Sequence, residues 1–148
     1  MDIDLVLAPV DGSSQSDAAA DYALAIADAY DADIHLLFVL NETLVRAIDA
    51  GEVDADAIAD QHHDFASDVQ SRLDDRARDA TLNHSTAAGF SPTRLRQSPG
   101  SVILDVAEDI DADFIVVPRE SDSEGAEDAI GRAALYVIEY ASQPVLSV

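Results

Sequence analysis

The sequence contains no lysine and no cysteine, and these two absences exclude several kinds of chemistry. Without lysine there is no Schiff-base nucleophile, no lysine-dependent phosphate loop and no Ser-Lys dyad. Without cysteine there is no disulfide, no thiolate nucleophile and no cysteine-ligated zinc. The chain also lacks any apolar run near the roughly 18 residues that span a bilayer. We therefore expect neither covalent catalysis by lysine or cysteine nor a membrane span.

Positive charge is scarce in this chain. Eight arginines face 30 acidic residues, of which 23 are Asp, and the formal net charge is −22. A surface this acidic repels phosphodiester backbones and anionic lipids, so we expect no nucleic acid and no membrane as a partner. High intracellular salt explains the bias, because at molar ionic strength the Debye length is about 3 Å and self-repulsion is screened. The composition therefore indicates a salt-adapted, halophilic host.

The length and the apolar content indicate one globular domain over residues 1–148. Apolar residues make up 48% of the 148 residues, which is enough to fill a core despite the charge. The first residues, from Met1 to Asp4, lack the basic start of a signal peptide. We therefore expect a soluble protein in the cytoplasm.

Apolar runs and helical periodicities alternate along the chain. The predicted strands cover residues 5–8, 34–40, 93–97, 114–117 and 145–148, with the run at 93–97 suited to a sheet edge. The predicted helices cover about 15–29, 42–49, 54 toward 88 with a stop at Gly89, 101–110, and a last helix containing 134–141. This order predicts an α/β fold, a single-domain three-layer sandwich with a five-stranded parallel sheet and helices on both faces.

Two short segments repeat each other. Residues 30–34 read Tyr-Asp-Ala-Asp-Ile and residues 110–114 read Ile-Asp-Ala-Asp-Phe, and each joins the end of a predicted helix to an apolar strand. We therefore predict two equivalent turns between helix and strand.

The four histidines and the many serines do not form a catalytic or metal-binding pattern. His62 and His63 are neighbours on a predicted helix and point about 100° apart, so they cannot share one ion. His35 lies in a strand and His84 in a poorly specified region, and we interpret all four as packed or solvated. No serine stands in a G-x-S-x-G turn, and G-x-G-x-x-G and G-x-x-x-x-G-K-[ST] are also missing. We expect no metal site and no enzymatic activity.

Both ends of the chain resemble one family. Residues 5–14, which read LVLAPVDGSS, resemble the first strand and following turn of the universal stress protein (UspA-like) family. Residues 112–117 (ADFIVV) and 144–148 (PVLSV) resemble the family's fourth and fifth strands, and the element order matches along the whole chain. The resemblance implies a stress-response or regulatory role and a homodimer paired through the terminal strand, Val145 to Val148.

Nucleotide-binding members of that family carry G-x-x-G-x9-G-[ST] after the fourth strand, and this chain departs from the motif. Pro118 and Ser121 stand where the first two glycines belong, Gly131 matches the third, and Arg132 replaces the hydroxyl residue. Proline has no N–H to donate and serine lacks glycine's freedom, so the same phosphate cradle cannot form. The resemblance thus implies a degenerate ATP-binding motif, and we expect no cofactor.

The rest of the implied nucleotide pocket is better preserved. In an open parallel sheet, ligands bind at the carboxyl ends of strands where the strand order reverses. Positions matching those that contact adenine and ribose in binding members are Pro9, Asp11, Val39 and Val117. Arg119 and Arg132 could grip phosphate in place of the glycines, or could pair with neighbouring acids. The candidate pocket residues are Pro9, Asp11, Val39, Val117, Arg119, Gly131 and Arg132.

Two functions therefore follow from the sequence. The first is a dimeric regulatory protein that acts through protein contacts and does not hold ATP tightly. The alternative is an ATP or AMP sensor that uses Arg119 and Arg132 in place of the glycine cradle.

The salt interpretation predicts a loss of stability on dilution of the salt. Transfer from molar salt to about 0.1 M salt restores repulsion among exposed carboxylates over roughly 10 Å and should lower the melting temperature. Thermal unfolding followed by circular dichroism at both salt concentrations measures this. Equal melting temperatures would contradict the salt adaptation.

Overall fold

The computed structural model describes residues 2–11, 14–76, 79–89, 98–119 and 129–148. Its strands are β1 (Leu5–Val10), β2 (Asp33–Leu40), β3 (Leu82–Ala88), β4 (Phe114–Val117) and β5 (Val145–Ser147). Its helices are α1 (Ser14–Tyr30), α2 (Glu42–Asp49), α3 (Ala55–Arg76), α4 (Pro99–Asp109) and α5 (Ala129–Tyr140). The elements alternate between strand and helix, apart from the successive helices α2 and α3.

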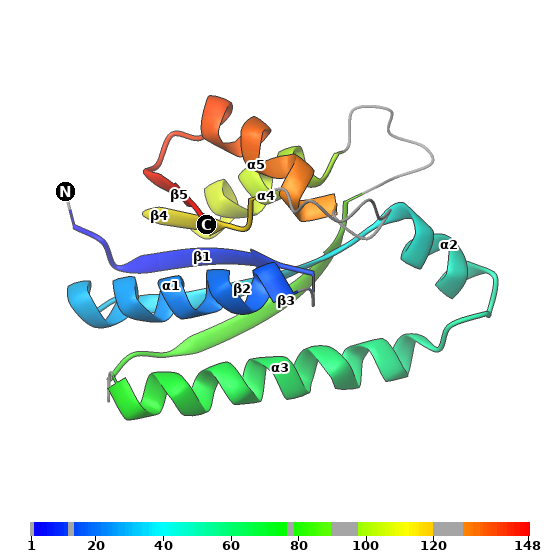
Figure 1. Ribbon diagram of the computed structural model, residues 1–148, viewed down its shortest axis with the longest axis horizontal. Helices are drawn as coiled ribbons and strands as arrows, with labels where there is room; N and C mark the ends of the chain where they lie inside the picture. The colour runs from blue at the N-terminus through cyan, green and yellow to red at the C-terminus, as the bar shows by residue number, and fades with distance from the viewer. Residues whose placement is uncertain (1, 12–13, 77–78, 90–97, 120–128) are drawn as a thin grey trace.

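The five strands form one parallel sheet in the order β3-β2-β1-β4-β5. Figure 1 shows α1 and α3 on one side of the strands and α4 and α5 on the other. The predicted α/β fold, with a five-stranded parallel sheet covered by helices on both faces, is confirmed. The terminal strand β5 lies at one edge of the sheet, and β3 lies at the other.

The central strand β1 is buried on both faces of the sheet. Val6, Ala8 and Val10 pack with α1 and α3, whereas Leu7 packs with α4 and α5. Because both faces are covered, β1 is apolar at every position, as a strand between two helical layers must be.

Among the described helices, none has the length and apolar character needed to cross a membrane.

The third strand is the main correction to the sequence-based prediction. The helix expected to run from Asp54 toward Ala88 ends at Arg76, and residues 82–88 form β3 instead. β3 pairs with β2 along its whole length, from Leu82 opposite Ile34 to Ala88 opposite Leu40. The pairing outweighs the weak helical periodicity in this segment, which polar and β-branched residues already interrupt. The strand predicted at 93–97 lies outside the described residues.

The two repeated segments form the same turn, as predicted. Asp31 has φ = 57° and Asp111 has φ = 56°, and these are the non-glycine residues with positive φ among those described. In each segment the following alanine, Ala32 or Ala112, is buried and donates its N–H to a carbonyl five residues earlier at 2.9 Å. Each turn thus ends one helix and directs the chain into a buried strand.

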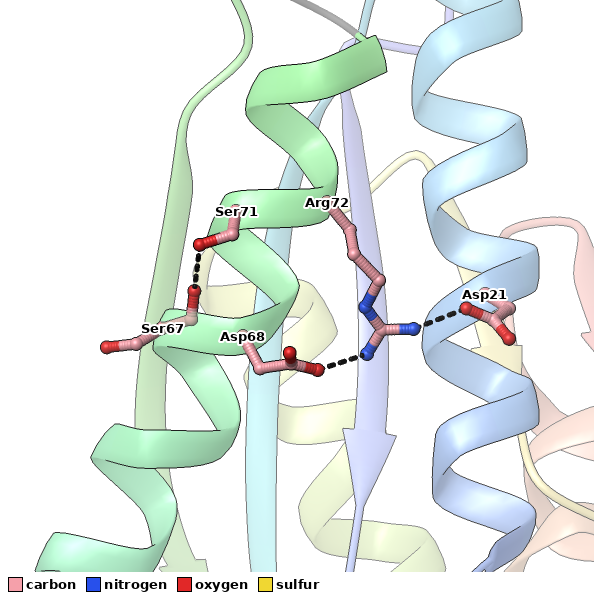
Figure 2. Close-up of polar contacts among 5 residues, drawn as sticks. All are labelled: Asp21, Ser67, Asp68, Ser71 and Arg72. Carbon is pink, nitrogen blue, oxygen red and sulfur yellow. Dashed lines mark hydrogen bonds and ion pairs between the residues drawn. The ribbon is translucent and has the colours of Figure 1, made fainter.

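Arg72 of α3 connects the two helices that cover one face of the sheet. Figure 2 shows its guanidinium between Asp21 of α1 and Asp68, one turn earlier on α3. The Arg72 Nη2 to Asp68 Oδ2 distance is 3.0 Å, and about one third of the Arg72 side chain is exposed. The Asp21 and Asp68 side chains are 64% and 71% exposed, so molar salt screens both pairs. The pair of Arg72 with Asp21 connects α1 and α3, and its contribution is greatest at low salt.

The turn geometry predicts equal effects at the two aspartates. Asp31→Ala and Asp111→Ala should each lower the free energy of unfolding by about 1 kcal/mol, because alanine enters the left-handed region at a higher cost than Asp or Asn. Asp31→Asn and Asp111→Asn, which tolerate that region, are the matched controls and should stay near the parent. Chemical unfolding in molar salt measures all four variants. A loss at only one of the two turns would show that the turns are not equivalent.

Candidate functional site

The strand order reverses between β1 and β4, and the candidate residues gather at the carboxyl ends of these strands. The chain leaves β1 toward β2 on one side of the sheet, while β4 and β5 extend the other side. Val39 and Val117 pack with α4 and α5, and Pro9 shares the side of Leu7, two residues earlier on β1. The switch point therefore brings Pro9, Val39 and Val117 to one end of one face.

Asp11, directly after β1, is fixed by a buried serine. Its backbone N–H donates to Ser16 Oγ at 2.8 Å, and Ser16 Oγ donates to Asp11 Oδ1 at 2.7 Å. Ser16 is fully buried in the first turns of α1, so this pair of bonds holds the Asp11 carboxylate at the end of β1. Asp11 itself is half-buried, as a residue that contacts a ligand at this edge would be.

Gly89 brings the end of β3 close to the site. A Cβ atom at Gly89 would lie 3.0 Å from Val39 Cγ1 and 3.0 Å from Pro99 Cγ. The Gly89 N–H donates to the Leu40 carbonyl at 2.9 Å, which extends the pairing of β3 with β2. Gly89 is not the helix stop that the sequence predicts, because it follows β3 and permits close packing beside Val39.

The backbone after β4 offers no N–H for a phosphate at its first two positions. Pro118 is buried and has no N–H, and the N–H of Arg119 donates to the carbonyl of Val148 at 2.6 Å. The Arg119 side chain is exposed. This arrangement ties the end of β4 to the end of β5, and it leaves the exposed side chain of Arg119 as the hydrogen-bond donor that these two positions can offer.

The remaining candidate positions are described only in part. Gly131 and Arg132 lie in the first turns of α5, where the structure gives the backbone path alone. Ser121, together with the acids expected to pair with the arginines, lies outside the described residues. The structure therefore brings together Pro9, Asp11, Val39 and Val117.

A cavity of about 500 Å³ lies at the opposite end of the sheet, where α4 and α5 end. Glu108 and Asp111 line it, together with Tyr140. Asp113 also lines it, and its Oδ2 accepts the N–H groups of Asp4 and Leu5. Carboxylates and the carbonyl ends of two helices make this cavity negative, so it is unsuited to a phosphate group.

Three histidines gather around β2 and β3, a cluster that the sequence did not predict. The His62 ring of α3 stacks on Phe38 with centroids 4.1 Å apart, and His84 meets Phe38 edge to face. His62 Nδ1 lies 3.3 Å from Thr86 Oγ1, and His35 Nε2 lies 2.8 Å from Ser85 Oγ. No group of His, Cys, Asp or Glu in the described part of the chain is arranged to hold a metal.

Burial alters the proton affinity of two of these histidines. Desolvation lowers the pKa of His35 and of His62 below the usual 6.5, and the nearby His84 lowers both further. Both rings are therefore held in the neutral form over a wider pH range than exposed histidines. Their neutral rings suit the contacts with Phe38 and Ser85.

Comparisons with known proteins agree with this geometry. The model of the universal stress protein family matches residues 3–148. None of the curated proteins matches the chain. Universal stress protein UspA from Lactobacillus plantarum is 21% identical, with a TM-score of 0.69 over 100% of this chain and 99% of that one.

Two similar structures contain an adenine nucleotide. A universal stress protein in complex with cAMP is 19% identical, with a TM-score of 0.64 over 100% of this chain and 98% of that one. The universal stress protein from Archaeoglobus fulgidus in complex with dAMP is 17% identical, with a TM-score of 0.58 over 98% of this chain and 96% of that one. At these identities the likeness shows the shared fold.

The histidine cluster predicts a loss of stability in mild acid. The folded state has lowered histidine pKa values, so below about pH 6.5 the unfolded chain binds more protons than the folded one. Above that pH the histidines do not lower the free energy of unfolding. As the pH drops toward the lowered histidine pKa values of the folded state, the free energy of unfolding falls. The melting temperature in molar salt should therefore be lower at about pH 5.5 than at about pH 7.5.

Two phenylalanine variants separate His62 from a general acid effect. His62→Phe keeps an aromatic ring on Phe38 but removes the titrating group, so its melting temperature should fall less between the two pH values. His63→Phe, at the exposed neighbouring position of α3, is the control and should keep the full pH dependence. An unchanged pH dependence in His62→Phe would show that His62 does not carry the effect.

Proposed function

The chain belongs to the universal stress protein family, and from that premise we propose that it acts as a dimeric stress-response or regulatory protein through protein contacts. In this proposal the protein is not an enzyme and does not hold ATP tightly. Its nucleotide site is a degenerate version of the family's site, which lacks the backbone groups that would bind the phosphates.

One observation carries this proposal. A triphosphate cradle needs several backbone N–H groups directed at one point. After β4, Pro118 supplies no N–H, and the N–H of Arg119 is already bonded to the Val148 carbonyl. At the end of β1, the N–H of Asp11 is bonded to Ser16 Oγ. Among the described residues, the backbone donors nearest the switch point, those of Asp11 and Arg119, are thus bonded within the protein itself.

The dimer is proposed to form at the open edge of β5. The Pro144 carbonyl and both backbone groups of Val148 bond to β4 and the residues after it. Because backbone polar groups alternate along a strand, Val145 and Ser147 direct theirs away from β4. An edge strand with unpaired groups is a template for pairing with another strand, and a second β5 is such a strand.

The alternative is a sensor of adenine nucleotides with few phosphates. Two observations favour it over other nucleotide functions: Pro9, Asp11, Val39 and Val117 converge at the switch point, and two similar proteins hold cAMP and dAMP. A monophosphate needs fewer backbone donors than a triphosphate. In this case Arg119 and Arg132 would bind the phosphate by side-chain contacts.

We also propose that the acidic, lysine-free surface is an adaptation to high salt. The 30 acids serve solubility at molar ionic strength, where their mutual repulsion is screened.

Calorimetry with ATP and AMP in molar salt tests the degenerate site. We expect no micromolar ATP site in the parent protein, because Pro118 has no N–H and the N–H of Arg119 is bonded to Val148. Pro118→Gly with Ser121→Gly and Arg132→Ser restores the family motif and should create measurable ATP binding. Adding Asp11→Ala to that triple variant should abolish the gain, since it removes the carboxylate held by Ser16.

The alternative predicts a different result in the same experiment. Micromolar AMP or ATP binding by the parent protein, lost in Arg119→Ala with Arg132→Ala, would establish the arginine sensor and contradict the degenerate site. Arg46→Ala, which removes an exposed arginine of α2 from its pair with Glu42, is the control for loss of positive charge.

A further inference from the structure

Strand β3 forms the edge of the sheet opposite β5, and its outer side is open. In the part of the chain that the structure describes, β3 pairs with β2 on one side and with no strand on the other. Edge strands are usually protected from further pairing by a charged residue, a proline or a bulge. β3 contains no Asp, Glu, Arg or Pro, and its register with β2 is continuous, so its outer side can accept another strand.

The hydrogen bonds to β2 determine which backbone groups of β3 point outward. The Thr81 carbonyl and the Gly89 N–H, which flank β3, both bond to β2, at 3.0 and 2.9 Å. Backbone groups point alternately to the two sides of a strand, so the odd-numbered residues between them also bond to β2. The N–H and C=O groups of Leu82, His84 and Thr86 therefore point to the open edge.

The flank of α3 on the side of this open edge is acidic. Figure 2 shows α1 on one side of α3 and β3 on the other, with Arg72 pointing to α1 and Ser67 pointing away from it. Positions seven or eleven residues from Ser67 lie on the same side of a helix with 3.6 residues per turn. These positions are Asp56, Asp60 and Asp74, and all three are exposed. A strand added to β3 would therefore lie beside carboxylates.

A second copy of this chain does not suit the β3 edge. Pairing of two β3 strands would bring two α3 helices together, and each α3 holds six acids against two arginines. With a net charge of −22, two copies repel each other over most of their surfaces, whereas a basic chain is attracted. The charge of this protein thus discriminates against self-pairing at β3 and in favour of a positively charged segment.

We propose that the outer side of β3 binds an extended, basic segment of a partner protein as a sixth strand of the sheet. The backbone of this segment bonds to the outward groups of Leu82, His84 and Thr86. Its arginine or lysine side chains, at alternate positions, lie beside the acidic flank of α3. This inference rests on the proposed action through protein contacts and adds the chemistry of the partner.

Synthetic peptides test the charge and the strand pairing separately. The probe is a peptide of about eight residues, a usual strand length, in which arginine alternates with valine. Calorimetry at the lowest salt concentration at which circular dichroism shows a folded parent should detect binding, which weakens as salt is added. Peptides with glutamate in place of arginine, or with proline in place of valine, should not bind. Equal binding of the valine and proline peptides would contradict the strand pairing, and equal binding of the arginine and glutamate peptides would contradict the basic partner.

Two pairs of variants locate the site on the protein. Thr86→Pro removes one outward N–H, which an edge strand tolerates, and should weaken binding of the arginine–valine peptide by about fivefold or more. Its control is Thr86→Ala, which keeps that N–H and also loses the Thr86 hydroxyl near His62. Asp74→Asn should weaken binding by about two- to fivefold, whereas Asp75→Asn, about 100° further round α3, should not. Equal losses within the first pair would contradict the strand pairing, and within the second pair the contact with α3.

Amide hydrogen exchange followed by NMR reports the pairing at each residue. In the parent alone, the outward N–H groups of His84 and Thr86 should exchange faster than the inward N–H groups of Asn83 and Ser85. The arginine–valine peptide should slow exchange at His84 and Thr86. Outward groups that are already protected in the parent alone would show that the edge is occupied, and would overturn the proposal.

The peptide experiment fails independently of the proposed function. If the arginine–valine peptide does not bind, the β3 site is wrong, while a parent without a micromolar ATP site still supports the degenerate nucleotide pocket. If the peptide binds and the parent also binds ATP at micromolar concentration, the β3 site stands and the degenerate pocket is wrong. Thr86→Pro should leave the sedimenting mass unchanged, because β3 and β5 lie at opposite edges of the sheet.

Discussion

Burial of the parallel sheet on both faces is the constraint that organises this protein. The last five residues of β1 are buried, and the two clusters on either side of it collect the apolar faces of α1 and α3 and of α4 and α5. The acids of the described residues are therefore restricted to the outer faces of helices, to the turns and to the strand ends. With both faces covered, a ligand can reach the sheet only at its two ends, and a protein partner only at the helices or at an edge strand.

The carboxyl end and the β5 edge are linked by one backbone bond. The Arg119 N–H that donates to the Val148 carbonyl removes a phosphate donor and also fixes the last residue of the chain against the end of β4. Freeing that donor for a ligand would loosen the end of the edge strand. In the proposed function, the position that makes the nucleotide site degenerate would thus also rigidify the proposed dimer edge, and a rigid edge strand pairs at a lower entropic cost.

The sequence predicted the parts of the fold that depend on local pattern. Strands β1 and β4 are uninterrupted apolar runs and β2 is apolar apart from Asp33 and His35, and the repeated segments around Asp31 and Asp111 carry residues that tolerate positive φ. The prediction of a helix over residues 82–88 was wrong because this segment forms β3, whose structure is decided by pairing with β2. The polar residues of β3 face outward at the sheet edge, so the segment lacks the apolar pattern of a strand. The grouping of Pro9, Val39 and Val117 follows from strand order, whereas the stacking of His62 on Phe38 needs the packing of α3, which no local pattern contains.

Salt acts on folding and on association through the same two physical terms. Molar salt screens the repulsion among 30 acids within one chain, and it screens the repulsion between two chains in the same way. Strongly hydrated salts also strengthen the burial of apolar surface in the core. The proposed pairing of two β5 strands, which carry no charged side chain, would therefore be favoured by the same salt that we propose stabilises the fold. A dimer held by ion pairs would lose stability there, and with eight arginines the chain could form few of them.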